Sequence, residues 1–390
     1  MTTTESPHVH AEEPAPAQAA KARHLRQLDL YRVITFALVI FIHVLVATTY
    51  PDNVISAAIE APLHFARAAF FALTTFVLLF QYRSRPLEAR RFWRHRIPLV
   101  AVPYLVWSVL YWAYGMLTSP NPVGPLSGQL WALLIQIATG SAWYHLYFLL
   151  VTLQVYLVFP LLVKLVEVIR RRPWTVLAVS ALVQVAVMSL LSYPPGSVDY
   201  TTVSRFFATL LPYQFYSMLG AVAAVHLETM HGWLREHRGW VPAGLAAGLA
   251  VLEIGYLVSV GHGAWPEMAA DAYRPYLLPW VVVAIAALYM AGSRWAAGRQ
   301  RAGRFISWAV DRSFAVFLCH PFALALLGPL IEFVGNRYGS PWTTIVVYPV
   351  TVLLTFAIVL VLRRLPWSKA LTGRAPVRAP APAVPRSVLG

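Results

Sequence analysis

The stretch LDLYR at residues 28–32 opens an apolar run, VITFALVIFIHVLVATT at residues 33–49, that contains one histidine, His43. About 20 apolar residues are enough for a helix to cross a bilayer. A charged side chain inside such a helix is costly, about 2.5–3.5 kcal/mol for Arg or Asp at the centre. The run therefore predicts a membrane-spanning helix, and its ionisable side chains become the first candidates for function.

Arg32 and His43 share one face of this predicted helix. They are eleven positions apart, which places them within about 20° of each other and roughly 16 Å apart along the axis. One helix thus carries a guanidinium near one membrane surface and an imidazole toward the other. The alternative is that Arg32 only snorkels to the headgroups and that His43 is a packed polar residue.

The composition indicates a polytopic membrane protein. Hydrophobic residues make up 58% of the 390 residues and charged residues only 12%, about half the charged fraction of a soluble domain. The net charge of +15 could suggest nucleic acid. The basic residues, however, occur in short segments between apolar runs, which is typical of membrane topology and contact with anionic lipid. We therefore expect membrane lipid as a partner and no nucleic acid.

The predicted fold is an all-α bundle of about ten transmembrane helices. The transmembrane domain is expected over residues 25–365, between disordered cytoplasmic tails at residues 1–24 and 366–390. A short apolar segment at residues 126–138 is interpreted as a re-entrant or interfacial helix. The predicted spans are residues 30–50, 61–82, 97–117, 143–166, 174–191, 203–225, 240–260, 276–292, 314–332 and 343–362.

The distribution of arginine and lysine predicts the orientation. Basic residues precede the first span and fill the connections after spans two, four, six, eight and ten, whereas the alternate connections carry few. By the positive-inside rule both termini are cytoplasmic. We expect a multi-pass protein of the cell (plasma) membrane.

Five ionisable groups on five predicted helices fall in one layer near the outer surface. Each would be costly alone in lipid, but together they are tolerable around a water-filled cavity. We therefore expect an outer acceptor pocket. Alternatively, Arg67 and Glu253 form a structural ion pair and His145 is interfacial. The five groups are those of His43, Arg67, His145, Arg205 and Glu253.

A second basic group lies at the cytoplasmic side. Arg94 and Arg96 lead into the third span, and Arg32 faces the same side. Arginine forks suit phosphate groups, although topology and lipid headgroups explain such runs equally well. Asp29, three residues before Arg32, is expected to orient that guanidinium through a helical-face ion pair.

The remaining polar residues in the spans are expected to have structural roles. His320 precedes Pro321, and such a histidine can bond carbonyls that a proline kink leaves free. Gln154, Gln184 and Gln214 are expected to form interhelical hydrogen bonds. The sequence contains no P-loop, no GxGxxG opening a helix and no paired-cysteine zinc motif. We therefore expect no metal and no bound cofactor.

Five motifs stand out in the sequence: Asp29-x-x-Arg32 with His43, FFALTTFVLL at residues 70–79, Arg94-x-Arg96, YHLYFL at residues 144–149 and FLCHP at residues 317–321. Together they resemble the membrane acyltransferase family 3. Two threonines, at positions 74 and 75, stand where the family has Ser-Gly. The stretch at residues 144–149 is also similar to relatives that act on surface poly-N-acetylglucosamine.

The resemblance implies an O-acyltransferase that moves an acyl group, acetyl or succinyl-like, from cytoplasmic acyl-CoA to a hydroxyl of a sugar. His43 and Arg32 would be the catalytic residues, and Arg94 and Arg96, with Arg32, would hold the donor phosphates. His43 would be the general base or would itself carry the acyl group. Two alternatives remain: a polysaccharide exporter or flippase, and a catalytically silent subunit of a polysaccharide synthase. Synthase or export proteins are accordingly possible partners.

Overall fold

The computed structural model describes residues 25–83, 86–119, 124–196 and 200–377. The predicted N-terminal tail, residues 1–24, lies outside these ranges. The described residues form an all-helical protein without strands. The helices are α1 Gln27–Thr48, α2 Val54–Leu63, α3 Phe65–Tyr82, α4 Ala89–Thr118, α5 Leu126–Thr139, α6 Tyr147–Lys164, α7 Val166–Arg171, α8 Pro173–Ser192, α9 Tyr200–Phe206, η1 Leu211–Tyr213, α10 Gln214–Val225, α11 Leu227–Glu236, α12 Trp240–Gly261, α13 Pro266–Ala270, α14 Leu277–Ala297, α15 Gly303–Leu326, α16 Gly328–Tyr338, α17 Trp342–Leu362 and α18 Ser368–Thr372.

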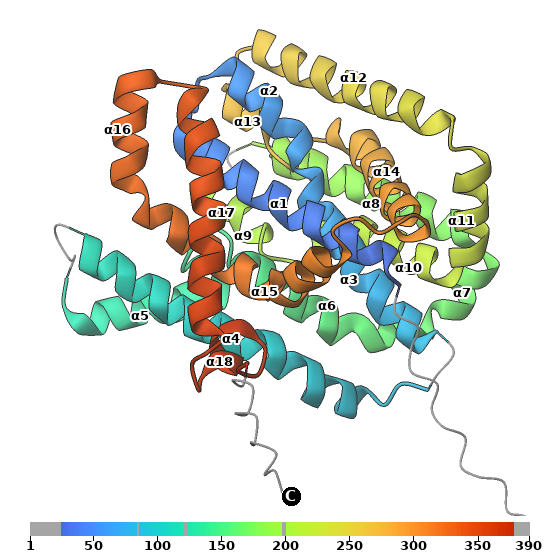
Figure 1. The fold of residues 1–390 in the computed structure, drawn as a ribbon. Coiled ribbons are helices and arrows are strands. Elements are labelled where there is room, and N and C mark those ends of the chain that lie inside the picture. The colour runs from blue at the N-terminus through green and yellow to red at the C-terminus, as the bar shows by residue number, and fades with distance from the viewer. Residues whose placement is uncertain (1–24, 84–85, 120–123, 197–199, 378–390) are drawn as a thin grey trace, which may run out of the picture.

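Nine helical segments in the described residues are long and apolar enough to cross a membrane. This confirms the predicted polytopic helical fold. Helix α1 crosses the middle of the bundle, with α12 along one edge and α4 along the opposite edge (Figure 1). It packs against α3, α14, α15 and α17. The helix that carries Arg32 and His43 is thus also the central helix of the structure.

The predicted span at residues 203–225 is not one helix. It is divided into α9, the short η1 and the twelve-residue α10. Pro212 lies within η1, and proline removes a backbone donor and disrupts a helix interior. Glutamine side chains satisfy the interrupted backbone: Gln154 Nε2 donates to the Ala208 carbonyl at 2.7 Å, and Gln184 Nε2 donates to the Pro212 carbonyl at 2.7 Å. The predicted interhelical role of these two glutamines is confirmed.

Helix α3 is held close to α10 at a glycine. A Cβ atom added at Gly220 would collide with the backbone of Ala72, so only glycine permits this approach. Thr75, which stands in place of a family glycine, is fully buried one turn away. The close contact at this part of α3 is therefore made by the glycine of α10.

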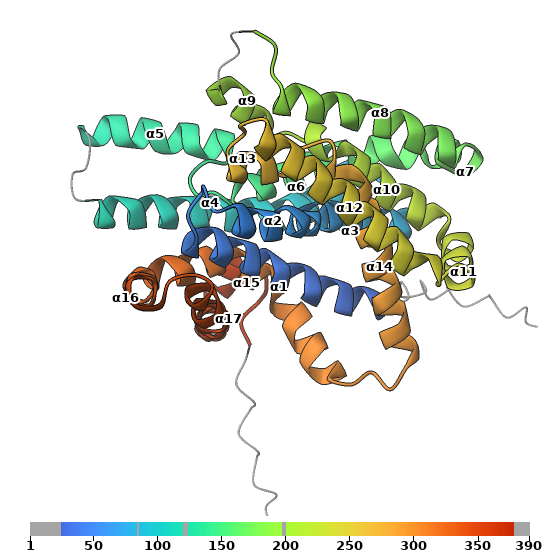
Figure 2. The same cartoon turned by 90° about the horizontal axis from the view of Figure 1, so that it is seen from above.

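Two short helices flank the bundle. Helix α5 lies alongside α4 at one end in both views (Figures 1 and 2) and buries only Leu133, in keeping with the predicted short apolar helix. Helix α18 falls within the predicted C-terminal tail, yet Ser368 and Thr372 are fully buried. It packs against α4, α15 and α17. The tail is therefore folded through residue 377, and residues 378–390 lie outside the described ranges.

Candidate active site

A cavity of about 1390 Å³ lies at the C-terminal end of α1. We call this the outer cavity, because the arginine-rich connections lie at the other end of α1. Its wall includes residues from irregular backbone within 140–145, 207–208 and 271–274. Non-helical backbone at membrane depth is tolerated where protein buries it or where it lines a water-filled space. The interruption of the predicted sixth span is therefore part of how this cavity is built.

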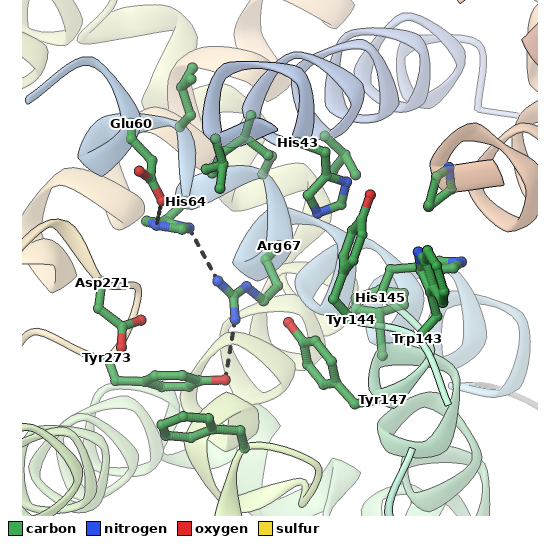
Figure 3. Close-up of a pocket in the computed structure, with 18 of the residues that line it drawn as sticks. His43, Glu60, His64, Arg67, Trp143, Tyr144, His145, Tyr147, Asp271 and Tyr273 are labelled. Atoms are coloured by element: carbon green, nitrogen blue, oxygen red, sulfur yellow. Dashed lines mark hydrogen bonds and ion pairs between the residues drawn. The ribbon is translucent and has the colours of Figure 1, made fainter. Parts of the chain in front are cut away.

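His43 lies on the wall of the outer cavity and is half-buried. Its Nδ1 is 2.7 Å from Nε2 of His320 on α15. The two imidazole rings are nearly parallel, with centroids 5.0 Å apart. The ring of Tyr144 meets His43 edge-on, with ring centroids 4.9 Å apart (Figure 3).

Pro321 fixes the proton on His320. Because Pro321 has no N–H, the Phe317 carbonyl loses its normal helical partner. His320 Nδ1 lies 2.9 Å from this carbonyl and 3.2 Å from the Val316 carbonyl. A carbonyl only accepts, so Nδ1 carries the proton and Nε2 of the neutral ring is an acceptor. This bond is the carbonyl-capping role predicted for His320 from the sequence.

The proton on His320 in turn determines the tautomer of His43. Since His320 Nε2 accepts, His43 Nδ1 is the donor in the 2.7 Å bond between the rings. The lone pair of neutral His43 is then on Nε2. A histidine whose second nitrogen is engaged this way is oriented to accept a proton. The sequence did not reveal the His43–His320 contact, because it joins residues of the first and ninth predicted spans.

His145 lies beside this pair in the wall of the outer cavity. It is only 2% exposed, and its ring contacts those of Tyr111, Phe317 and His320. Within the described residues neither of its ring nitrogens makes a hydrogen bond, and the same holds for the indole nitrogen of Trp143. Buried polar atoms normally have a partner. His145 and Trp143 therefore bring buried, poorly satisfied polar atoms close to the wall of the outer cavity.

Arg67 projects into the outer cavity from α3 (Figure 3). One guanidinium nitrogen donates to Tyr273 Oη at 3.2 Å, and another donates to His64 Nδ1 at 3.1 Å. His64 Nε2 must then carry the proton, and it lies 3.3 Å from a carboxylate oxygen of Glu60. Glu60, His64 and Arg67 thus form a linked series of polar side chains. Asp271 is a second, more distant negative charge that acts on Arg67.

The sequence missed Glu60 and His64, although their spacing contained a signal. Glu60, His64 and Arg67 follow an i, i+4, i+7 pattern, which places them on one helical face. His64 stands at the break between α2 and α3, where Pro62 disturbs the backbone. The aromatic lining from Trp143, Tyr147 and Tyr273 was also missed, since tyrosine and tryptophan are common at membrane interfaces.

Two predicted pocket residues do not line the outer cavity. Arg205 is exposed on α9, where Val203 and Ser204 face the cavity instead. Glu253 is on α12, at the edge of the bundle (Figure 1), and is not part of the cavity wall. The alternative ion pair between Arg67 and Glu253 does not form either, because Arg67 binds Tyr273 and His64. Helix adjacency, which the sequence does not contain, separates these residues from His43.

At the arginine-rich end, the structure brings together part of the predicted donor site. The charges of Arg32 and Arg96 both act on the hydroxyl of Tyr156 on α6. Arg96 also donates to Gln81 at 3.0 Å. Asp29 is buried and attracts Arg32, as predicted for an orienting carboxylate. Arg94 is exposed on the first turns of α4.

No group of three or more His, Cys, Asp or Glu side chains in the described part of the chain is arranged to hold a metal ion. The ionisable groups of the outer cavity are histidines, arginines and carboxylates joined to one another or to tyrosines. This set suits proton transfer and the binding of polar groups.

Comparison with known proteins identifies the chain. Residues 25–364 match the model of the acyltransferase domain of the family designated Acyl_transf_3. No curated protein and no solved structure matches it significantly. The match covers most of the chain and includes both the outer cavity and the arginine-rich end. The chain is a multi-pass integral membrane protein that belongs to the membrane acyltransferase family 3.

Proposed function

We propose that this acyltransferase uses acyl-CoA from the cytoplasm and acylates a sugar hydroxyl of a cell-surface polysaccharide or glycoside. The observation that carries the proposal is the contact between His43, on the cavity wall, and the fully buried His320. His43 Nδ1 donates to His320 Nε2 at 2.7 Å, so His43 Nε2 is available as a base. The proposed location is the plasma membrane, with the outer cavity facing away from the cytoplasm.

His43 acts as general base on the acceptor hydroxyl. Its Nε2 accepts the hydroxyl proton while the oxygen attacks the thioester carbonyl. The new C–O bond forms, the C–S bond breaks, and the proton passes from His43 to the departing CoA thiolate. The hydrogen bond from Nδ1 to His320 stabilises the imidazolium that forms in between. General-base help of this kind is typically worth about 10²–10⁴ in rate.

The donor approaches from the arginine-rich end. Arg32 and Arg96, whose charges both act on Tyr156, hold the phosphates of the donor. The exposed Arg94 adds positive charge at the entrance. Arg32 and His43 are roughly 16 Å apart along α1. The pantetheine arm of CoA is slender and long enough to carry the thioester over such a distance.

The acceptor occupies the outer cavity. Tyr144 and Tyr147 line the cavity with aromatic side chains that can pack against a sugar, and Arg67 offers donors that a sugar oxygen can accept. The unpartnered nitrogens of His145 and Trp143 would pair with further hydroxyl groups. The cavity, at about 1390 Å³, exceeds the usual 300–1000 Å³ of small-molecule pockets, which favours an oligosaccharide or polymer end.

Purified protein in lipid nanodiscs tests the proposal. With labelled acetyl-CoA or succinyl-CoA and surface glycan fragments, we expect release of CoA together with an acylated sugar detected by mass spectrometry. Sugar movement across a vesicle membrane without consumption of acyl-CoA would instead establish an exporter or flippase. Binding to a polysaccharide synthase with no turnover, and no effect of changing His43, would establish the silent subunit.

Acyl transfer through an acylated histidine is separable from general-base catalysis. We expect no covalently labelled protein when labelled acyl-CoA is added without acceptor and the sample is quenched. A label that remains on wild-type protein and is absent from His43→Ala would assign His43 as the acyl carrier instead.

A further inference from the structure

A second basic cluster, outside the donor site described above, lies where α15, the end of α17 and the C-terminal segment meet. We call it the Asp311 cluster, and it comprises Asp311, Arg312, Arg363 and Arg374. The three guanidinium groups converge on one carboxylate. Asp311 lies 3.5 Å from Arg312, 3.3 Å from Arg363 and 3.8 Å from Arg374.

The Asp311 cluster has a surplus of positive charge. Three arginines are always protonated, and one carboxylate leaves a net charge of +2. The surplus includes a buried group: Arg363 is 8% exposed, and its Nε and Nη1 have no hydrogen-bond partner among the described residues. Arg312 Nε is likewise buried without one. A buried charged donor without an acceptor is costly, so this cluster lacks an anion.

The C-terminal segment holds Arg374 in place. Ser368 Oγ donates to the Arg374 carbonyl at 3.0 Å, and the Arg374 amide donates to Thr372 Oγ1 at 3.3 Å. Gly373 adopts a φ of +68°, a conformation that favours glycine. The guanidinium itself is 60% exposed. A hydrogen-bonded turn therefore presents an exposed cation at the edge of the cluster.

The Asp311 cluster is continuous with the donor end of α1. The charges of Arg374 and Arg32 lie close enough to repel each other. Trp107 of α4 anchors α18 through a bond from its indole nitrogen to the Leu371 carbonyl, at 2.9 Å. Helix α4 also carries Arg96. The C-terminal segment thus brings Arg374 near Arg32 and rests on the helix that carries Arg96.

We propose that the Asp311 cluster binds a phosphate monoester dianion, and that Arg374 is its exposed ligand. A dianion matches the surplus of +2, and guanidinium forks suit its geometry. The source of this phosphate follows from the proposed function, on which this step rests. It is the 3′-phosphate of CoA, while Arg32 and Arg96 hold the pyrophosphate. The monoester phosphate of phosphatidic acid has the same chemistry and is the other source.

The experiment compares CoA with dephospho-CoA, which lacks only the 3′-phosphate. Binding is measured by calorimetry on the full chain in nanodiscs of zwitterionic lipid. The variant is Arg374→Gln, and the matched control is Arg364→Gln, since Arg364 is exposed on the same connection. We expect Arg374→Gln to weaken CoA binding about tenfold, the loss of one charge-assisted hydrogen bond. Dephospho-CoA binding and the control variant should be unchanged.

Equal losses for CoA and dephospho-CoA, or no loss for either, would overturn the proposal. If wild-type protein binds neither, the donor half of the proposed function fails. In that case inorganic phosphate and vesicles with phosphatidic acid are tested on their own. Binding of either one that Arg374→Gln weakens would retain the phosphate site with a lipid or free phosphate as its source, and binding of neither would remove it.

A second variant separates binding from folding. Asp311→Asn removes the carboxylate that competes with an incoming phosphate. We expect it to increase the preference for CoA over dephospho-CoA, measured as the ratio of the two dissociation constants. A purely structural cluster would instead show lower thermal stability of Asp311→Asn with the ratio unchanged, which would contradict the proposal.

Discussion

The outer cavity and the Asp311 cluster handle charge in opposite ways. In the cavity, Arg67 is matched through His64 to Glu60, and His43 and His320 share a proton between neutral rings. In the cluster, three guanidinium groups share Asp311 and leave two charges unmatched. A balanced network suits the transfer of a proton, whereas a surplus suits the capture of an anion. In the proposed function, acyl transfer therefore takes place in the outer cavity and the donor phosphates bind at the opposite end of the protein.

The largest effect is expected from His43→Ala. Loss of the base should lower the rate of acyl transfer by about 10²–10⁴, while the affinity for CoA stays the same. Single-turnover transfer and calorimetry measure the two quantities. His262→Ala is the control, because His262 is exposed and bonds only within its own helix. A large loss of CoA affinity in His43→Ala would contradict the proposal that acyl transfer and donor binding depend on opposite ends of the protein.

A smaller loss is expected from His320→Ala, which leaves His43 present but removes the acceptor for its Nδ1. Misplacement of a catalytic group costs roughly 100-fold, and we expect a loss of that order in kcat with little change in either KM. Pro321→Ala perturbs the same contact less than His320→Ala does. It supplies an N–H that competes with His320 for the Phe317 carbonyl, so kcat should fall less. An unchanged kcat in His320→Ala would show that the histidine contact has no catalytic role.

Arg67 tests the acceptor side. Arg67→Gln removes the charge and should raise the KM for the acceptor about tenfold, the cost of one charge-assisted hydrogen bond. Arg67→Lys keeps the charge but loses the planar fork, so its effect should be smaller. In both variants the KM for acyl-CoA should not change. A rise in the donor KM alone would place Arg67 in the donor path.

The smallest effects are expected at the donor entrance, and they should differ between two arginines. Arg96→Gln should raise the KM for acyl-CoA several-fold, because Arg96 is half-buried and acts on Tyr156 together with Arg32. Arg94→Gln should raise it less, because Arg94 is exposed and its charge is screened. Initial rates over a range of acyl-CoA concentrations measure both. Equal effects on acceptor KM would argue against a donor site at this end.

The sequence predicted the helical bundle and the importance of α1, because membrane-spanning length and the spacing of Arg32 and His43 are local properties. It also predicted that His320 bonds backbone carbonyls, since Pro321 is the next residue. It did not predict the His43–His320 contact, and it placed Glu253 and Arg205 in a pocket that they do not line. These errors have one cause: hydropathy and spacing give depth in the membrane, but they do not give the neighbours of a helix.

Local breaks in the helical backbone are the second feature that the sequence did not predict. The predicted span at residues 203–225 is hydrophobic enough to cross, yet Pro212 and the glutamine bonds to its flanks divide it. The predicted C-terminal tail is partly folded because Ser368 and Thr372 bury their hydroxyls in bonds to one another and to the Arg374 carbonyl. Such side-chain caps involve few residues, so they hardly change the amino-acid composition of the segment from which disorder was predicted.

The central claim is that His43 and His320 act as one unit, and a double-mutant cycle tests it most directly. Single-turnover rates of acyl transfer are measured for wild type, His43→Gln, His320→Gln and the double variant. If His320 acts only through His43, the double variant should be as slow as His43→Gln alone. Losses that multiply independently in the double variant would contradict the account.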